Sequence, residues 1–462
     1  MLSDVEENLN TLMLLTGISE EEAAMLLRHR VRVISSTKDD LPLLAADIRN
    51  LLKRTLTVVG ERDKCDLELA IGTNPTTDNA LILSLSNEEM KIMSSEDKEA
   101  VSERTRIPGI TRKGCACFAA GFVLSRLLGD SLPYTTRSRF DFRFENLGFP
   151  TTGTLEPLDI KDSVLAGGGG VANGFLWALE ELNPVGKLTI VDPKKVRSGN
   201  ANRCLYFQTD DCDYKATILA ERVNLPYVEV IPYIGTLHDY VASRPDRRLP
   251  WLISTADSRV VRRSFQNELP LAVFDASTTD VSEVIIHSHE QPNGAACLSC
   301  IYPHIEDEDH RDKHIAETLG LTLEEVQARF IDQKTAEKLA TNFAGLKAEA
   351  LVGIAFDSLH KALCGQQALL TQEAKQEAAP FAFVSNLAGV LLALEMYRHQ
   401  ANYEDWSRTN YMAVSPWVAP HKRLRRLRPR LPDCEFCSNP STDVALREIW
   451  SGMGTPSARC NK

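Results

Sequence analysis

Four consecutive glycines, Gly167 to Gly170, constrain the fold more than any other feature of this sequence. They separate the apolar segment DSVLA (162–166), which is typical of a buried strand, from the helical pattern GFLWALEEL (174–182). A second strand pattern, KLTIVD (187–192), follows directly. Strand, glycine turn, helix and strand form a βαβ unit, in which the two strands run parallel in one sheet. The sequence therefore predicts an α/β fold with a mostly parallel sheet.

The glycine turn also carries a nucleotide-binding pattern. Gly167, Gly169 and Ala172 match G-x-G-x-x-G/A after a strand and at the start of a helix, as in Rossmann-like folds. Glycines let phosphates approach the backbone, and a helix N-terminus favours their charge. Asp192 ends the second strand, where a carboxylate can accept hydrogen bonds from ribose hydroxyls. A tight turn that binds nothing is the alternative, but strand, loop, helix and acid together favour nucleotide binding.

Taken alone, this pattern indicates NAD, but the residues that follow indicate phosphate chemistry. Asn202 and Arg203 stand in SGNANRCLYF, Lys215 in DYKATILAERV and Asp257 in STADSRVVRR. A guanidinium and an ammonium suit a reaction in which charge builds on phosphate oxygens. A dehydrogenase has no use for this set. The alternative is that Arg203 and Lys215 are solvated surface charges.

Two C-x-x-C pairs predict a metal site. Cys297 and Cys300 form the first pair, and Cys434 and Cys437 the second. Four thiolates suit tetrahedral zinc, although the pairs lie farther apart than in most zinc ribbons. Buried thiols or a redox pair are the alternatives.

Composition limits the partners and the compartment. The 462 residues include 52 Lys+Arg and 63 Asp+Glu, a net charge of −11, which disfavours non-specific binding to nucleic acid or to an anionic membrane. The N-terminus has acidic residues where a signal peptide needs basic ones, and no apolar run approaches the length of a membrane span. We therefore expect a cytoplasmic protein with neither nucleic acid nor membrane as a partner.

A chain of this length exceeds one hydrophobic core, and its patterns divide it into four regions. Residues 1–156 alternate helix and strand patterns without a glycine loop, and SEEEAAMLLRHRV (19–31) is typical of an amphipathic helix. The βαβ region covers 157–303. A charged, helical stretch covers 304–380, and an apolar helix followed by a tail with the second cysteine pair covers 381–462.

These motifs, in this order, resemble the adenylyltransferases that activate the C-terminus of ubiquitin, ubiquitin-like and sulfur-carrier proteins, a superfamily that includes the molybdopterin and thiamin biosynthesis adenylyltransferases. The layout is most similar to the bacterial ubiquitin-like activating proteins of antiphage defence operons. The resemblance implies a Rossmann-like adenylation domain preceded by a degenerate, inactive α/β copy, with a helical crossover insertion and a zinc site. It implies these roles: phosphate binding by Gly167 and Gly169, ribose binding by Asp192, triphosphate binding by Asn202, Arg203 and Lys215, Mg²⁺ binding by Asp257, and Zn²⁺ binding by Cys297, Cys300, Cys434 and Cys437.

The implied function is ATP-dependent adenylation of the C-terminus of a ubiquitin-like protein, followed by thioester formation and transfer to a conjugating enzyme. Arg203, Lys215 and Asp257 would be catalytic, and Cys364, the one cysteine of the crossover segment, is the expected nucleophile. A buried helical cysteine is the alternative for Cys364. The sequence departs from the family at Lys194, where the family has a second acid. A catalytically impaired nucleotide-binding scaffold is therefore the alternative function.

Overall fold

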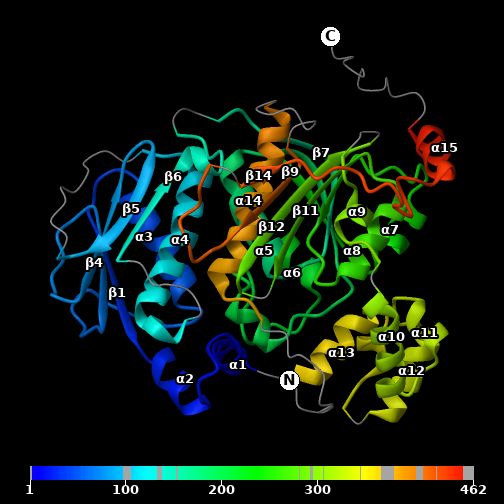
Figure 1. The fold of residues 1–462 in the computed structure, drawn as a ribbon, viewed down its shortest axis with the longest axis horizontal. Helices are drawn as coiled ribbons and strands as arrows, with labels where there is room; N and C mark the ends of the chain where they lie inside the picture. Colours follow the sequence, from blue (N-terminus) through cyan, green and yellow to red (C-terminus); the bar gives the residue numbers. More distant parts are fainter. Residues whose placement is uncertain are drawn as a thin grey trace.

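The computed structural model contains two β-sheets joined through a layer of helices (Figure 1). It describes residues 3–96, 106–132, 138–151, 155–279, 281–291, 295–304, 306–343, 345–365, 379–401, 409–422 and 424–450. In that part of the chain, no helix combines the length and the apolar character needed to cross a membrane.

The N-terminal sheet has six strands in the order β2-β1-β3-β4-β5-β6. Its strands are β1 (Arg30–Ser35), β2 (Thr57–Val59), β3 (Leu67–Ile71), β4 (Ala80–Leu85), β5 (Glu89–Ser94) and β6 (Arg139–Arg143). The accompanying helices are α1 (Asp4–Thr16), α2 (Glu20–Leu27), α3 (Leu41–Leu52) and α4 (Gly109–Leu128). The helix predicted over 19–31 ends at Leu27, and its last two residues belong to β1, because the alternating Val31 and Val33 enter the core of this sheet.

The second sheet has eight strands in the order β14-β13-β12-β11-β10-β7-β8-β9. Its strands are β7 (Asp159–Ala166), β8 (Val185–Val191), β9 (Val228–Tyr233), β10 (Trp251–Ser254), β11 (Ala272–Thr279), β12 (Glu283–Glu290), β13 (Tyr411–Val414) and β14 (Arg425–Arg426). The helices around it are α5 (Gly170–Leu179), α6 (Lys215–Arg222), α7 (Leu237–Ser243), α8 (Arg259–Phe265), α9 (Leu298–Ile301), α14 (Ala382–Gln400) and α15 (Pro440–Ile449). Five neighbouring strands, β9, β8, β7, β10 and β11, are parallel, as predicted, whereas β12, β13 and β14 are antiparallel additions.

The two sheets repeat one topology. In the first, β1, β2, β3, β4, β5 and β6 have the same neighbours and the same strand directions as β7, β8, β10, β11, β12 and β13 in the second. Helix α3 follows the first strand as α5 does, and α4 joins the last two strands as α14 does. The loop after β1, however, has the sequence STKDD in place of the glycine turn. The first sheet is thus a copy of the second that lacks the phosphate-binding turn.

Helices α4, α5 and α14 pack between the sheets and hold them together (Figure 1). The contact between α5 and α14 depends on glycine: a Cβ atom on Gly389 would lie 2.1 Å from the backbone nitrogen of Phe175. Across the layer, the buried ammonium of Lys113 in α4 donates a hydrogen bond of 2.6 Å to the carbonyl of Trp177 in α5. Helix α1 of the N-terminal unit also packs against the 3-10 helix over Ser198–Asn202, which follows β8.

A separate helical module lies below the second sheet, at the lower right of Figure 1. It contains α10 (Glu306–Leu319), α11 (Leu323–Gln327), α12 (Gln333–Asn342) and α13 (Phe356–Gly365). These helices bury a hydrophobic cluster of their own around residues such as Leu319, Leu339 and Leu359. The chain then returns to the sheets through α14, in agreement with the helical insertion that the sequence predicts.

Candidate nucleotide site and metal centre

The glycine turn lies where the carboxyl ends of β7, β8 and β10 meet, before the first turn of α5. Gly167 has a φ of +105°, and a Cβ atom there would lie 3.0 Å from the backbone carbon of Thr255, so only glycine fits. No atom lies within 4 Å of a Cβ atom placed on Gly169, which lines an open cavity. A ligand can therefore approach the backbone at Gly169, and the N-terminus of α5 favours an anionic one.

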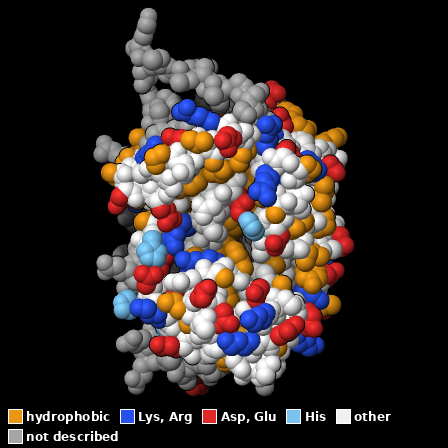
Figure 2. Space-filling model, turned by 90° about the vertical axis from the view of Figure 1, so that its right-hand side faces the viewer, with side chains coloured by type: hydrophobic (Ala, Val, Ile, Leu, Met, Phe, Trp, Pro, Cys, Tyr) orange, Lys and Arg blue, Asp and Glu red, His pale blue; other side chains and the backbone are white. Residues whose placement is uncertain are grey.

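The cavity beside this turn has a volume of about 1140 Å³ and extends from α1 to the helices α10, α11 and α13. Its described lining includes five Asp or Glu residues and ten Lys or Arg residues, although the whole chain has a net charge of −11. The ten are Lys194, Lys195, Arg197, Arg203, Lys215, Arg259, Arg262, Arg311, Arg329 and Arg428. On the face shown in Figure 2, by contrast, basic and acidic side chains are interspersed. The excess of positive charge in the cavity suits a polyanionic ligand.

Asp192 holds the glycine turn in place. One of its carboxylate oxygens accepts a hydrogen bond of 2.6 Å from the N–H of Gly168, and the other accepts one of 2.7 Å from the N–H of Lys194. The residue is only 5% exposed. Each oxygen retains a further lone pair. The predicted ribose-binding acid is therefore next to the turn, and it already orders the backbone there.

Lys215 brings an ammonium group to the same cavity from the first residue of α6. Its backbone N–H donates to the carbonyl of Lys194 over 2.9 Å, which fixes the start of α6 against the end of β8. Burial lowers the pKa of Lys215, and the nearby Asp192 opposes that shift. Within the described residues, the Lys215 ammonium makes no hydrogen bond or ion pair. A partly buried cation without a hydrogen-bond partner is less favourable than a fully solvated one, so an anionic ligand would stabilise this arrangement.

Arg203 and Asn202 end the 3-10 helix over Ser198–Asn202. Arg203 lines the cavity, where its guanidinium donates to the side-chain oxygen of Asn202 over 2.8 Å and lies 4.0 Å from the carboxylate of Glu7 in α1. Asn202 is 1% exposed, points toward Asn8 of α1 and is not among the cavity-lining residues. The structure therefore brings Arg203 to the site and leaves Asn202 as its support.

Arg54, just beyond α3, fixes this segment from the N-terminal unit. Its guanidinium donates to the carbonyls of Ala201, Leu205 and Phe207 over 2.8 to 3.1 Å. Sequence reasoning did not identify Arg54, because its partners are backbone carbonyls about 150 positions away and no local pattern marks it. The N-terminal unit thus contributes directly, through Arg54, to the geometry around Arg203.

Asp257 lies in the cavity after β10. One carboxylate oxygen is 3.1 Å from the ammonium of Lys194, and the other accepts a hydrogen bond of 3.0 Å from the hydroxyl of Ser358 in α13. Within the described residues, Asp257 is not part of any group of three or more metal-ligating side chains. A protein site for Mg²⁺ uses free carboxylate oxygens, whereas an ammonium lies here. The donor set around Asp257 therefore does not fit a dedicated magnesium site.

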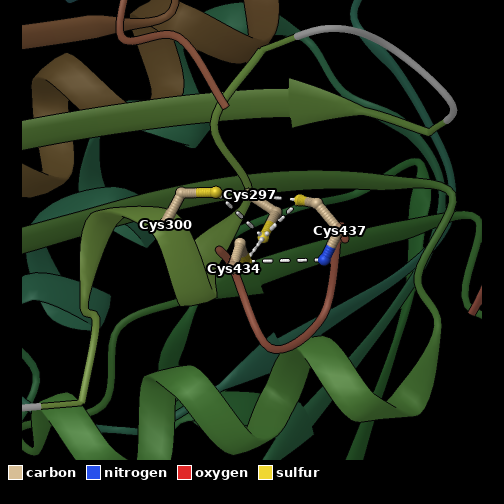
Figure 3. A group of neighbouring side chains, drawn as sticks. All are labelled: Cys297, Cys300, Cys434 and Cys437. Atoms are coloured by element: carbon tan, nitrogen blue, oxygen red, sulfur yellow. Dashed lines mark hydrogen bonds between the residues drawn. The ribbon is translucent and has the colours of Figure 1, made fainter. Parts of the chain in front are cut away.

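The two cysteine pairs meet in space, although 134 residues separate them (Figure 3). Cys297 and Cys300 come from the start of α9, and Cys434 and Cys437 come from the tail that leads to α15. The sulfur of Cys297 is 3.8 Å from those of Cys300 and Cys434 and 3.1 Å from that of Cys437, and the sulfurs of Cys300 and Cys437 are 3.7 Å apart.

Three of these four distances fit the expected metal, and the fourth, between Cys297 and Cys437, is shorter. Zinc with sulfur ligands at about 2.3 Å in a tetrahedron places the sulfurs about 3.8 Å from one another. All four ligand atoms lie within 4.8 Å of one another, so the residues could bind zinc. Four protein ligands leave no open position, so a metal here would stabilise the fold and would not take part in a reaction.

The predicted nucleophile, Cys364, is in the last turn of α13, and its side chain lies outside the described part of the structure. Cys204 lines the cavity, but burial raises the pKa of its thiol, which disfavours the thiolate. The structure therefore gives no geometry for a thioester step.

No family model matches the chain. The uncharacterized protein y4jF of Sinorhizobium fredii (strain NGR234) is 27% identical over 266 residues, which cover 54% of this chain and 50% of y4jF. The chain thus spans about half the length of this curated relative. Among solved structures, E. coli MccB with AMPCPP and MccA is 16% identical over 60% of this chain and 67% of MccB, with a TM-score of 0.38. PaaA is 13% identical over 73% and 86%, with a TM-score of 0.31. Scores this low leave the function to be inferred from the chain itself.

Proposed function

We propose that this protein is an adenylyltransferase that uses ATP to activate the C-terminal carboxylate of a ubiquitin-like protein. The observation that carries the proposal is the cationic cavity at the glycine turn, where Lys215, Arg203 and Asp257 converge. The volume of about 1140 Å³ exceeds what a nucleotide alone requires and leaves room for the end of a polypeptide. The resemblance of the ordered motifs to the ubiquitin-activating superfamily supports the same reaction.

In this reaction, a substrate carboxylate oxygen attacks the α-phosphorus of ATP and forms an acyl adenylate. The bond between the α-phosphorus and the bridging oxygen breaks, and pyrophosphate leaves with the electron pair. Arg203 and Lys215 would stabilise the negative charge that develops on the phosphate oxygens. Asp192 holds the glycine turn in the conformation that receives the phosphates.

We further propose that the acyl group moves to Cys364 and then to a conjugating enzyme. The Cys364 thiolate would attack the acyl carbon, form a thioester and release AMP, after its thiol proton has passed to solvent. The position of Cys364 in the crossover segment, as in the family that the chain resembles, supports this step. In the Cys364→Ala variant we expect unchanged pyrophosphate exchange and loss of the adduct that reductant removes; a persistent adduct would place the nucleophile elsewhere.

The decisive experiment is ATP–pyrophosphate exchange with a ubiquitin-like protein as the carboxylate substrate. We expect exchange in the wild type and at least a ~100-fold loss in Lys215→Ala, since one preorganised cation at a transferring phosphate contributes about that much. Lys187→Ala, in β8 and away from the cavity lining, is the control. Exchange that persists in Lys215→Ala would contradict the assignment of the site.

One observation favours a second candidate, a nucleotide-binding scaffold without catalysis. The acidic Glu7 lies 4.0 Å from Arg203, so an acid of the chain itself competes for the cation that phosphates would use. A scaffold would bind ATP without releasing pyrophosphate in the presence of any ubiquitin-like partner. The same exchange experiment therefore separates the two functions.

A further inference from the structure

The pair formed by Lys194 and Asp257 is the feature of the cavity that the proposed reaction leaves unexplained. The Lys194 ammonium lies 3.1 Å from one carboxylate oxygen of Asp257. The lysine side chain is 20% exposed and the aspartate side chain 65% exposed, so the carboxylate faces the open cavity while the lysine lies against its wall. An exposed carboxylate repels the phosphates of a bound nucleotide unless a cation lies between them.

The backbone around Lys194 is fixed by the residues of the nucleotide site. Its N–H donates to Asp192 over 2.7 Å, and its carbonyl accepts from the N–H of Lys215 over 2.9 Å. Lys194 therefore lies between the acid that orders the glycine turn and the cation that begins α6. Its ammonium enters the cavity from the loop that follows β8, where both backbone groups of the residue are hydrogen-bonded.

The position of Asp257 is equally constrained. Its second oxygen accepts a hydrogen bond of 3.0 Å from Ser358, in the helical module. An acceptor in contact with a hydroxyl and an ammonium has fewer lone pairs left for a divalent cation. The resemblance assigns Mg²⁺ to Asp257, but the structure places a covalently attached cation at this carboxylate.

We propose that the Lys194 ammonium stands in for a metal ion at this place and bridges the Asp257 carboxylate and the phosphates of ATP. This inference rests on the proposed nucleotide site and adds which residue supplies the positive charge between Asp257 and the phosphates. The fixed charge neutralises the repulsion between Asp257 and the ligand, so ATP binding depends little on divalent cations. Lys194 is then a phosphate-binding residue that replaces the second acid of the family.

The test is calorimetric titration of the full-length protein with ATP, once with excess MgCl₂ and once with excess EDTA. We expect wild-type affinities that differ by no more than ~3-fold between the two conditions, because the main counter-charge belongs to the chain. In Lys194→Ala, affinity in EDTA should fall at least ~10-fold, the loss expected for one charge-assisted contact, and Mg²⁺ should restore part of it. Lys187→Ala, in β8 itself and away from the cavity lining, is the matched control and should behave as the wild type.

A second variant keeps the proposal falsifiable. Lys194→Asp restores a pair of acids, so its ATP affinity should rise at least ~10-fold from EDTA to Mg²⁺. Circular dichroism checks that each variant keeps its melting temperature. Wild-type binding that needs Mg²⁺ as strongly as Lys194→Asp, or unchanged binding by Lys194→Ala in EDTA, would overturn the inference. Pyrophosphate exchange tests the proposed reaction separately. If ATP binds as expected in Mg²⁺ and in EDTA but no exchange occurs, the proposed reaction is wrong and the role of Lys194 in binding stands.

Discussion

Glu7, in the first described helix of the chain, lies 4.0 Å from the guanidinium of Arg203, and both residues line the candidate nucleotide cavity. Helix α1 is fixed there by Thr11, whose hydroxyl donates to the carbonyl of Ala379, and by Asn8, which donates to the carbonyl of Arg54. An acid from the degenerate half therefore lies next to a predicted catalytic cation of the other half. Its charge lowers the local preference for phosphate.

Removing this charge should tighten nucleotide binding. In Glu7→Gln we expect ATP affinity to rise about 2- to 5-fold, because a pair at 4.0 Å between partly exposed side chains contributes only modest energy. Calorimetric titration with ATP measures the change. Glu20→Gln, at the exposed start of α2, is the control and should leave the affinity as it was. Weaker binding by Glu7→Gln would show that Glu7 supports Arg203 and does not compete for it.

Much of the fold was predictable because its strongest patterns are local. The βαβ unit around Gly167 and the apolar helix over 381–399 each contain the signal of their own structure in a short window. The start of β1 was not predictable in this way. The helix pattern over 19–31 includes Arg30 and Val31, which begin β1, and the next residue, Arg32, is buried and paired with Glu68 in the structure. That pairing is visible only once β1 and β3 lie side by side.

The residues of the candidate site likewise divide into those that a local sequence pattern marks and those that only packing brings together. Arg203 and Lys215 follow the glycine turn in sequence order, so the resemblance could place them. Glu7, Arg54 and Ser358 reach the same region from α1, from the end of α3 and from α13. Each depends on packing between distant segments, and no spacing in the sequence marks it. The sequence marks Lys194 only as a departure from the family, and its pairing with Asp257 is visible only in the folded chain.

The glycine contact between α5 and α14 predicts a large loss of stability on substitution. A Cβ atom on Gly389 would lie 2.1 Å from the nitrogen of Phe175 and 2.3 Å from the carbonyl carbon of Gly174, and backbone atoms cannot rotate away. We expect Gly389→Ala to lower the free energy of unfolding by at least ~3 kcal/mol, as overpacking against backbone does. Thermal and urea unfolding measure the loss.

Gly169→Ala provides the contrast in the same protein. No atom lies within 4 Å of its added methyl group and its φ of −84° suits alanine, so the melting temperature should stay within ~2 °C of the wild type. ATP affinity should fall, because the methyl group blocks the approach of phosphate to the turn. If Gly389→Ala were as stable as Gly169→Ala, the two helices would not pack as closely as described.

The four cysteines predict one structural zinc ion per chain. Loss of one ligand in Cys437→Ser should abolish zinc binding and release the tail, because the cluster joins the loop before α9 to the segment before α15. The α15 segment also contacts the second sheet through side-chain hydrogen bonds, including one from Arg248 to the carbonyl of Ile449 and one from Trp450 to the carbonyl of Leu269.

Elemental analysis measures the zinc, and amide hydrogen exchange measures the tail. Exchange in α15 should accelerate at least ~10-fold in Cys437→Ser, while exchange in the parallel strands β7, β8 and β10 stays slow. Cys212→Ser, at an exposed cysteine outside the cluster, is the control. Protein purified without chelator that contains no zinc would refute the assignment.

The free energy of unfolding should fall in mild acid, and the contribution of His399 to this loss can be measured. Its ring packs edge-on against Trp251 and Phe274, with centroids 5.7 and 5.5 Å away. Burial lowers the pKa of His399 from 6.5 to about 4. The positive charge of Lys161 acts in the same direction, and the negative charge of Glu395 opposes it. Between these two values the unfolded chain binds a proton that the folded chain does not. Stability therefore decreases as pH falls through this window, by at most about 1.4 kcal/mol per pH unit for this group.

His399→Phe removes this proton uptake and keeps an aromatic ring in the same contacts. Relative to the wild type, the variant should gain about 2 kcal/mol in the free energy of unfolding on going from pH ~7 to pH ~5. Urea unfolding at the two pH values measures the difference. The exposed His238, which lies 2.9 Å from Glu268, is the control, and His238→Gln should show no such gain because its ring is already open to solvent in the folded protein. Parallel stability curves for His399→Phe and the wild type would mean that His399 is protonated in the folded protein, and that its place between Trp251 and Phe274 admits water.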